Sequence, residues 1–142
     1  MIYENIEIKL LDTPLDEQSC LEFAKSEDAG GLVLFVGTVR NQTKGKKVFR
    51  LDFEAYTSMA IKEMTKIAVD ATNRFNLSKA VIHHRVGRLN IGEIPVLIAA
   101  SSAHRGTAFQ ACEFMIDTLK ETVPIWKKEY FEDGEVWVSA TP

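Results

Sequence analysis

Hydrophobic residues recur along the chain with two different periods, which together predict an alternation of strands and helices. Seven segments show the polar–apolar alternation or the continuous β-branched composition that is typical of strands. They cover residues 6–10, 31–39, 48–56, 79–89, 95–103, 125–131 and 135–140. The segment 31–39 is apolar almost throughout, which predicts a strand that is buried on both faces.

Three further segments have the period of a helix. A helix is predicted within residues 12–30, with Thr13 as its cap. Apolar residues form one stripe at helical spacing through residues 57–75 and another through residues 108–119. Pro124 is expected to end the last helix, because it disfavours helical geometry in the residue before it.

The predicted order of elements is β-α-β-β-α-β-β-α-β-β. Because neighbouring strands are joined by short connections, antiparallel pairing is favoured, and the predicted fold class is α+β. The strand at 48–56 is expected to pair with its predecessor at 31–39, and residues 132–134 to form the turn of a last hairpin. With 142 residues and neither an internal repeat nor a linker, the chain is expected to form a single domain, residues 1–142.

Composition is that of an ordinary globular protein, with 46% hydrophobic and 26% charged residues. No apolar run approaches the ~20 residues that a membrane-spanning helix needs, and the N-terminus lacks the pattern of a signal peptide. A cytoplasmic location is therefore expected.

The net charge of −3 is unevenly placed, since residues 1–30 carry −6 and residues 31–142 carry +3. An anionic ligand is expected to bind to the basic part.

No cofactor and no metal site are predicted. The sequence has no Gly-x-x-x-x-Gly-Lys-Ser/Thr loop, and no Gly-x-Gly-x-x-Gly motif follows the first buried strand. His83 and His84 are adjacent on a strand and must point to opposite faces, and His104 is distant in sequence. Cys20 and Cys112 are expected to be reduced core residues, because nothing indicates secretion.

Basic residues at the ends of predicted elements are the candidates for ligand binding. Arg40 closes the apolar strand 31–39, a position where ligands commonly bind. It can equally begin the loop that contains Lys44, Lys46 and Lys47, which are expected to be solvated. Both interpretations of Arg40 stay open.

A second candidate is the segment Ser-Ser-Ala-His-Arg-Gly-Thr, residues 101–107, where a strand ends and a helix begins. Free N–H groups at a helix start favour an anion, and His104 and Arg105 add donors that suit a phosphate. The alternative is that Ser101 or Ser102 caps the helix while His104 packs locally.

A third candidate is the lysine-rich segment Lys-Glu-Thr-Val-Pro-Ile-Trp-Lys-Lys-Glu-Tyr, residues 120–130. Lys120 lies in the last turn of a predicted helix, where the helix dipole alone favours a cation. After the proline, Lys127 shares one strand face with Glu129, whereas Lys128 points to the other face. Lys120 and Lys127 can therefore converge, and crowded, partly desolvated ammonium groups are suited to nucleophilic or acid–base chemistry.

Several stretches, in order and spacing, resemble the large, catalytic subunit of molybdopterin synthase over essentially the whole chain. The matching stretches are GGLVLFVGTVRNQTKG, LDFEAYTSMA, VIHHRVGRLNIGE, SSAHRGTAFQACEFMIDTLKETVPIWKKE and DGEVWV. The resemblance implies an α+β domain of the α/β-hammerhead type with an additional antiparallel α+β subdomain.

The resemblance also implies an activity and an assembly. The family is a sulfurtransferase of molybdenum cofactor biosynthesis. It moves sulfur from the C-terminal Gly-Gly thiocarboxylate of a small ubiquitin-like carrier to cyclic pyranopterin monophosphate, and forms the dithiolene of molybdopterin. A central homodimer binds one carrier per subunit, which gives a heterotetramer, and neither nucleic acid nor a membrane is an implied partner.

Family residues carry over to matching positions of this sequence. The resemblance assigns these positions to substrate binding: Thr38, Val39, Arg40, His104, Arg105, Lys120, Lys127, Lys128 and Glu129. It implies that Lys120 and Lys127 are catalytic and that the Arg and His groups hold the phosphate of the pterin.

Two functions from other classes remain open from the residues alone. A non-catalytic module for an anion, a nucleotide or single-stranded nucleic acid would use the same cations, although only Trp126 and Tyr130 offer aromatic residues interleaved with them. An adaptor that docks a ubiquitin-like protein without chemistry would not need both Lys120 and Lys127.

Overall fold

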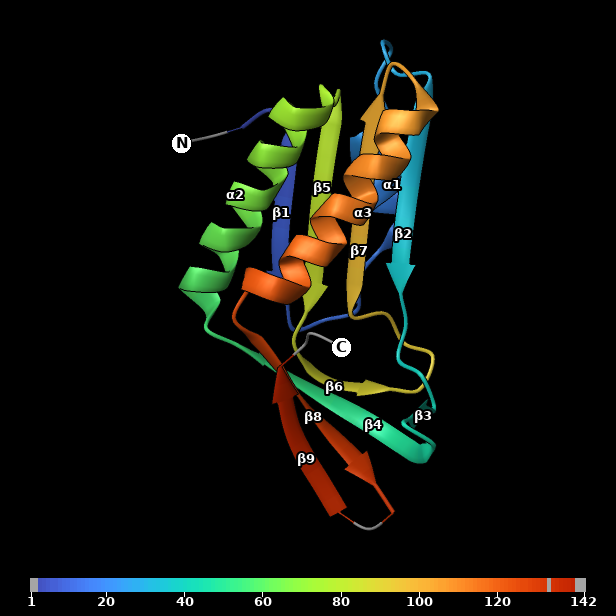
Figure 1. The fold of residues 1–142 in the computed structure, drawn as a ribbon, viewed down its shortest axis with the longest axis vertical. Coiled ribbons are helices and arrows are strands. Elements are labelled where there is room, and N and C mark those ends of the chain that lie inside the picture. The colour runs from blue at the N-terminus through green and yellow to red at the C-terminus, as the bar shows by residue number, and fades with distance from the viewer. Residues whose placement is uncertain (1–2, 133, 140–142) are drawn as a thin grey trace.

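The computed structural model describes residues 3–132 and 134–139. In this part of the chain the elements are β1 (Ile6–Leu11), α1 (Glu17–Ala24), β2 (Gly31–Gly37), β3 (Gln42–Thr43), β4 (Lys46–Ala55), α2 (Thr57–Phe75), β5 (Lys79–Arg85), β6 (Gly87–Asn90), β7 (Val96–Ser102), α3 (Arg105–Thr122), β8 (Ile125–Phe131) and β9 (Gly134–Ser139) (Figure 1). They form two sheets, one of which carries the helices.

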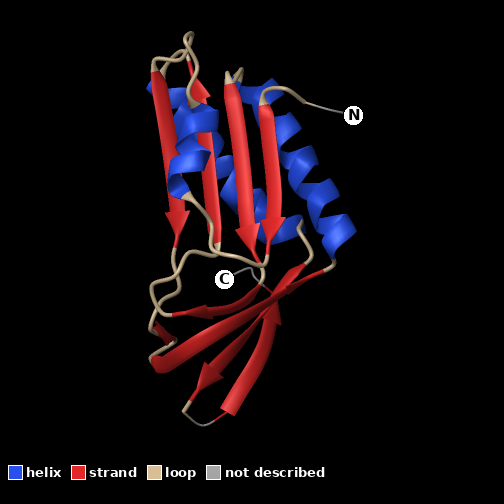
Figure 2. Ribbon diagram, turned by 180° about the vertical axis from the view of Figure 1, so that it is seen from behind, coloured by secondary structure: helices blue, strands red, loops and turns tan. Residues whose placement is uncertain are grey.

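The first sheet has the strand order β1-β5-β7-β2. β1 and β5 are parallel, whereas β5 and β2 are each antiparallel to β7. α2 and α3 cover one face of this sheet, and α1 lies on the other face (Figures 1 and 2). Along β5, Ile82 joins the core under α2 and α3, and Val81 joins the core under α1. Because side chains alternate along a strand, His84 lies on the face of Ile82, and His83 lies on the face of Val81.

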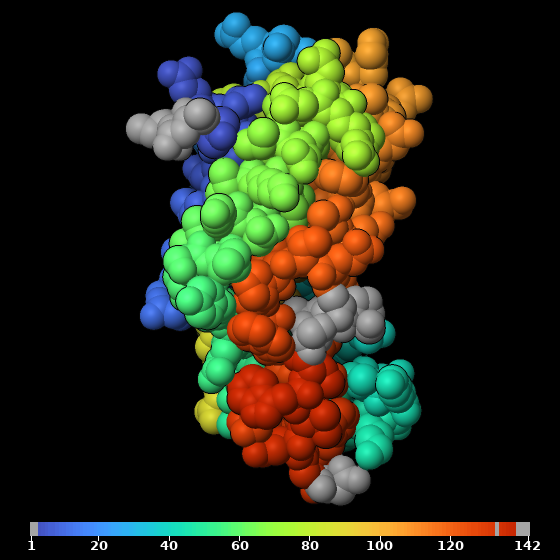
Figure 3. Space-filling model, turned by 60° about the vertical axis from the view of Figure 1, so that its left-hand side comes forward, coloured from blue at the N-terminus to red at the C-terminus, as the bar shows by residue number. Residues whose placement is uncertain are grey.

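The second sheet is antiparallel and has the order β3-β4-β8-β9, with β6 paired to β4. It lies at one end of the first sheet (Figure 1). α2 and the C-terminal half of α3 run side by side above it (Figure 3). Phe53 and Ile125 of this sheet share one apolar cluster with Ile82 of the first sheet and Leu119 of α3. The two sheets are therefore joined by a continuous core.

α3 shows how the sequence places one end of a helix beside the second sheet. Its apolar stripe is buried and consists of Ala108, Ala111, Cys112, Met115 and Leu119. The helix ends where Val123 becomes extended, with φ −82° and ψ 127°, immediately before Pro124. The prediction of this stripe and of its end is confirmed. Cys20 and Cys112 are buried free thiols, and burial raises the pKa of each to about 12.

The predicted α+β class is confirmed, but the predicted pairing of the segments 31–39 and 48–56 is wrong. β2 pairs with β7, and β4 pairs with β3, β6 and β8. The residues after β2 carry the chain from the first sheet to the second, so strands that are close in sequence lie in different sheets. β2 is also half-buried rather than buried on both faces, because it lies at the edge of its sheet.

Two predicted boundaries also needed correction. α1 begins at Glu17, and its cap is Asp16 rather than Thr13, because the Asp16 carboxylate accepts a hydrogen bond of 3.0 Å from the N–H of Gln18. The segment 79–89 forms two strands instead of one, since the chain turns at Gly87, where φ is +98°.

The last hairpin has the predicted strands, β8 and β9. Asp133 of its predicted turn and Ala140 of its predicted second strand lie outside the described residues. Within residues 3–132 and 134–139, the helices are too short or too polar to cross a membrane.

Candidate functional site

A cavity of about 300 Å³ lies where the second sheet meets the first sheet and the end of α3. Its lining residues come from six strands, one helix and the segments beside them: Phe35, Gly37, Thr38, Arg40, Thr43, Leu51, Phe53, His84, Pro95, Val96, Ile116, Leu119, Lys120, Lys127 and Glu129. Five of the nine positions assigned from the sequence are in this wall, namely Thr38, Arg40, Lys120, Lys127 and Glu129.

Lys120 reaches the cavity from the last turn of α3. Leu119, one residue earlier, is buried in the core and fixes the rotation of this helix end. Lys120 itself is half-buried. The C-terminal end of a helix carries partial negative charge, which stabilises a cation at this place.

Lys127 reaches the same cavity from β8. Burial lowers the pKa of Lys127, and the nearby positive charges of Lys120 and Arg40 lower it further, whereas Glu129 opposes them. Loss of solvation and like charge both disfavour the ammonium form. Lys127 therefore releases its proton more readily than an ordinary lysine.

Glu129 lies two residues after Lys127 and on the same strand face. It is only 5% exposed, and among the described residues its Oε2 atom is buried without a hydrogen-bond partner. A buried carboxylate oxygen of this kind is costly unless it is paired. Glu129 thus gives an otherwise basic cavity one strong acceptor.

Arg40 and Thr38 line the cavity from the segment after β2, while Val39 between them does not face it. The side chain of Val39 is buried in the core. Its backbone N–H donates to the Glu93 carbonyl at 3.0 Å, and its carbonyl accepts from the N–H of Gly92 at 2.9 Å. Val39 therefore anchors the segment, and its two neighbours project toward the cavity.

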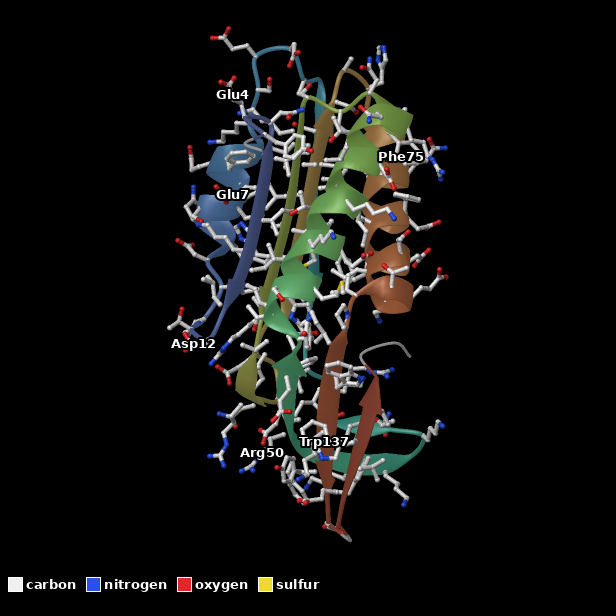
Figure 4. The ribbon with its side chains drawn as sticks, turned by 90° about the vertical axis from the view of Figure 1, so that its left-hand side faces the viewer. Glu4, Glu7, Asp12, Arg50, Phe75 and Trp137 are labelled. Atoms are coloured by element: carbon white, nitrogen blue, oxygen red, sulfur yellow. The ribbon has the colours of Figure 1, made fainter. Side chains whose placement is uncertain are left out.

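Lys128 lies on the opposite face of β8, away from the cavity. Its Nζ atom is 2.8 Å from Glu135 and lies over the rings of Tyr130 and Trp137. The hydrogen bond to Glu135 raises the pKa of Lys128. Figure 4 shows Trp137 on the second sheet, where it forms part of this outer surface. Lys128 lies on the face that the alternation along the strand predicted, and it pairs there with Glu135 rather than lining the cavity to which the resemblance assigned it.

His104 and Arg105 lie at the other end of α3 from Lys120. Both are exposed, and they line a separate shallow depression with Gly30, Ala103 and Gly106. Arg105 and Lys120 are fifteen residues apart on one helix, a separation of about 22 Å along its axis. Within one chain the pair therefore does not join the lysines.

Among the described residues, no side chain caps the start of α3. His104 is the N-cap residue, and its side chain makes no capping hydrogen bond. The hydroxyl of Ser102 donates to the carbonyl of His104 at 2.6 Å and is 2.8 Å from the hydroxyl of Thr107. Neither Ser101 nor Ser102 is the cap, so the N–H groups at this helix start remain available to an anion.

Sequence patterns assign no role to the other ten residues of the cavity wall, among them Phe35, Phe53 and His84. The two phenylalanines are ordinary members of apolar strands and carry no signal that sets them apart. The sequence offers His84 only as a candidate metal ligand. Its position near the end of a strand, like that of Arg40, is the one signal that was present.

Among residues 3–132 and 134–139, no three His, Cys, Asp or Glu side chains form a group that could hold a metal ion. His83 and His84 point to opposite faces of the first sheet, as the alternation along β5 predicts.

Comparison with known proteins gives consistent matches. The family model described as MoaE protein matches residues 10–122. The molybdopterin synthase catalytic subunit of Bacillus subtilis is 41% identical over 130 residues, which cover 92% of this chain and 83% of that protein. The subunit of the same name from Pyrococcus abyssi is 42% identical over 121 residues, 85% of this chain and 82% of that protein.

The fold matches a solved structure over nearly its whole length. The crystal structure of molybdopterin synthase from Staphylococcus aureus superposes with a TM-score of 0.86 at 40% sequence identity. The match covers 96% of this chain and 98% of that one.

Proposed function

This chain belongs to the MoaE protein family, and we propose that it is the catalytic subunit of a molybdopterin synthase. As a sulfurtransferase of molybdenum cofactor biosynthesis, it takes sulfur from the C-terminal thiocarboxylate of a small ubiquitin-like carrier. The acceptor is cyclic pyranopterin monophosphate, and the product is the dithiolene of molybdopterin. Since each carrier tail holds one sulfur atom, two carriers serve each product.

The observation that carries this proposal is the convergence of Arg40, Lys120 and Lys127 on one cavity that also holds the buried carboxylate of Glu129. Arg40 is far from the two lysines in sequence, and Lys120 and Lys127 belong to α3 and β8, on the two sides of Pro124. A solvated basic surface would not need such convergence. Thiocarboxylate and phosphate are both anions, and both suit a partly desolvated cluster of cations.

The cations differ in what they can do. The planar guanidinium of Arg40 suits a phosphate, which it can bind through two N–H donors. Burial lowers the pKa of Lys127, so two roles are open to this amine: proton transfer at Nζ and a transient adduct with the carbonyl carbon of the thiocarboxylate. Lys120 lines the same cavity and stabilises negative charge on the sulfur.

His104 and Arg105 take part through the assembly in this proposal. They lie too far from the cavity of their own chain, and they line an exposed depression at the start of α3. In a homodimer, the pair of one copy can bind the pterin phosphate at the cavity of the other copy. This arrangement places the helix start, with its free N–H groups, against the anion. Each copy also binds one carrier, which gives a heterotetramer.

A single domain, residues 1–142, and a cytoplasmic location also stay parts of the proposal. The single domain is supported by the apolar cluster that contains residues of both sheets. The cytoplasmic location is supported by the relatives, which are subunits of a biosynthetic enzyme.

A reconstituted sulfur-transfer assay tests the proposed function. The purified chain is mixed with thiocarboxylated carrier and cyclic pyranopterin monophosphate, and molybdopterin is measured by the fluorescence of its oxidised form. We expect product from the wild type and its loss in Lys120→Ala and Lys127→Ala. Lys128→Ala is the matched control, because Lys128 is a lysine of the same strand that pairs with Glu135 outside the cavity.

Failure of this assay has a defined meaning. If the wild type binds the carrier and yields no product, the chain is an adaptor for a ubiquitin-like protein. If Lys128→Ala abolishes product as fully as Lys127→Ala, the cavity is not the site of transfer.

A further inference from the structure

His84 contributes a ring to the wall of the cavity, although nothing in the proposed mechanism uses it. It lies near the end of β5 and is only 3% exposed. Its neighbour His83 is equally buried, at 2%, but lies on the opposite face and contacts Glu7 at 2.8 Å. The two histidines thus differ in surroundings and not in burial.

The hydrogen bond of His84 fixes which ring nitrogen carries the proton. Nδ1 is 2.9 Å from the carbonyl oxygen of Arg85. A carbonyl oxygen only accepts hydrogen bonds, so Nδ1 must be the donor. Burial lowers the pKa of His84 to about 4, and the ring is neutral at physiological pH. Nε2 therefore carries a lone pair and no proton.

The same hydrogen bond fixes where Nε2 points. Nδ1 is held at the backbone of the next residue, and Nε2 is on the far side of the ring from the strand. Phe53 meets the ring edge-on, with 5.5 Å between the ring centroids. In the described part of the chain, the contacts of His84 include no hydrogen-bond partner for Nε2. Nε2 is not among the buried side-chain atoms of the described residues that lack a partner, so this acceptor is open to the cavity, where a donor group of a ligand can take the place of water.

We propose that Nε2 of His84 accepts a hydrogen bond from an N–H or O–H group of the bound pterin. The identity of this ligand rests on the proposed function. Arg40, Lys120 and Lys127 offer donors that suit anionic groups, and Glu129 is a charged acceptor. His84 adds a neutral acceptor, which recognises a donor on the heterocycle rather than the phosphate. It is thereby a specificity-determining residue for the ring system.

Two substitutions separate the two nitrogens of the ring. In His84→Asn, the amide can still donate to the Arg85 carbonyl from the place of Nδ1, but no acceptor remains at the place of Nε2. In His84→Gln, the longer side chain can return an acceptor to the place of Nε2, while the donor at Nδ1 is lost. His83→Gln is the matched control, since it keeps a donor toward Glu7 and does not touch the cavity.

The experiment measures the dissociation constant of cyclic pyranopterin monophosphate for the purified full chain by calorimetry, without carrier. Thermal melts of each variant show that it is folded. We expect His84→Asn to weaken binding by about tenfold, as the loss of one hydrogen bond to a ligand does, and His84→Gln to stay within about threefold of the wild type. His83→Gln is expected to bind as the wild type does.

Two results would overturn the inference. One is wild-type binding by His84→Asn, and the other is equal weakening in His84→Asn and His84→Gln, which would indicate a purely structural role. Sulfur transfer is measured separately on the same preparations. A wild type that binds the pterin and transfers no sulfur contradicts the proposed function, while the dissociation constants still decide the role of His84. A wild type that does not bind the pterin contradicts both.

Discussion

Lys127 on β8 lies directly opposite Phe53 on β4 in the register of the second sheet. Their side chains share one face, and both line the cavity. Cross-strand partners have Cβ atoms about 4.5–5.5 Å apart, so the lysine stem packs against a phenylalanine that is itself only 5% exposed. This partner explains why burial is the main cause of the lowered pKa of Lys127. The fold therefore holds Lys127 at a position where desolvation disfavours its charged form.

Replacement of Lys127 by methionine should therefore raise stability while it abolishes sulfur transfer. The methionine keeps the apolar stem and removes both the desolvated ammonium group and its repulsion from Lys120 and Arg40. We expect the free energy of unfolding in urea to rise by about 1 kcal/mol at pH 7. Lys128→Met is the control, and it should change stability by less, because the Lys128–Glu135 pair is at the surface.

The gain from Lys127→Met should depend on pH in one direction. The pKa of Lys127 is lowered in the folded state, so between that pKa and the ordinary value the unfolded chain binds more protons and wild-type stability rises with pH. The difference between variant and wild type should be largest at neutral pH and shrink as the pH approaches 10.5, the ordinary lysine value. A difference that grows with pH would contradict the buried-charge explanation.

His84 should make the wild type sensitive to mild acid. Burial lowers its pKa from 6.5 to about 4. At a pH between these two values, His84 binds a proton in the unfolded state but not in the folded state. Stability is therefore lost as the pH falls from 6.5 to 4, by about 3 kcal/mol in total at the acid end. Urea unfolding of the wild type and His84→Asn at pH 7 and pH 4.5 measures this loss.

The variant should lose clearly less stability than the wild type over this range. His83 contributes in the same direction, since burial lowers its pKa against the opposing effect of Glu7. His83→Gln therefore serves as the second reference. Equal losses in the wild type and His84→Asn would show that His84 does not stay neutral in the folded protein.

Structural features that depend on a single helix or strand could be predicted from the sequence. The end of α3, the face of β8 that carries Lys127, and the position of Arg40 after a strand all follow from periodicity and from Pro124. The pairing of β4 could not be predicted, because a short connection does not reveal that the chain has passed into another sheet.

His84 shows the other limit of sequence-based prediction. Its role depends on the contact with Phe53 and on the carbonyl of Arg85, and alternation along β5 gives only the face on which it lies. The separation of His104 and Arg105 from the lysines is different, because it follows from the length of α3 alone. It could have been predicted by counting helical turns.

Gly31 should be essential for the close packing of the start of α3 against β2. A Cβ atom at this position would lie 2.7 Å from the Cα atom of Arg105, which is backbone and cannot rotate away. Gly31→Ala must therefore displace the helix start, and we expect it to lower the free energy of unfolding by about 1–3 kcal/mol. The same displacement moves His104 and Arg105, so sulfur transfer should fall as well.

Gly106→Ala is the matched control for this helix start. Nothing lies within 4 Å of a Cβ atom at Gly106, and the residue is helical. Alanine is favoured over glycine in a helix by up to about 1 kcal/mol, so this variant should be at least as stable as the wild type. Equal destabilisation by both substitutions would argue against a steric role for Gly31. Urea unfolding of the two variants compares them directly.

If the His104–Arg105 pair of one copy serves the cavity of the other, two inactive variants should restore activity in a mixed dimer. Lys127→Ala and Arg105→Ala are co-expressed with different tags, and the mixed dimer is purified on both. One of its two sites combines both substitutions, whereas the other contains neither. We expect the mixed dimer to have about half of the wild-type rate of sulfur transfer.

The control combines Lys127→Ala with Lys120→Ala. Both lysines line the cavity of a single chain, so each site of this mixed dimer has lost one of them, and no activity should return. Recovery only in the Lys127–Arg105 combination is the signature of a site shared between two copies. If that combination stays inactive, the arginine acts within its own chain or away from the reaction. The distance along α3 would then require the pterin phosphate to be bound by Arg40 and the lysines alone.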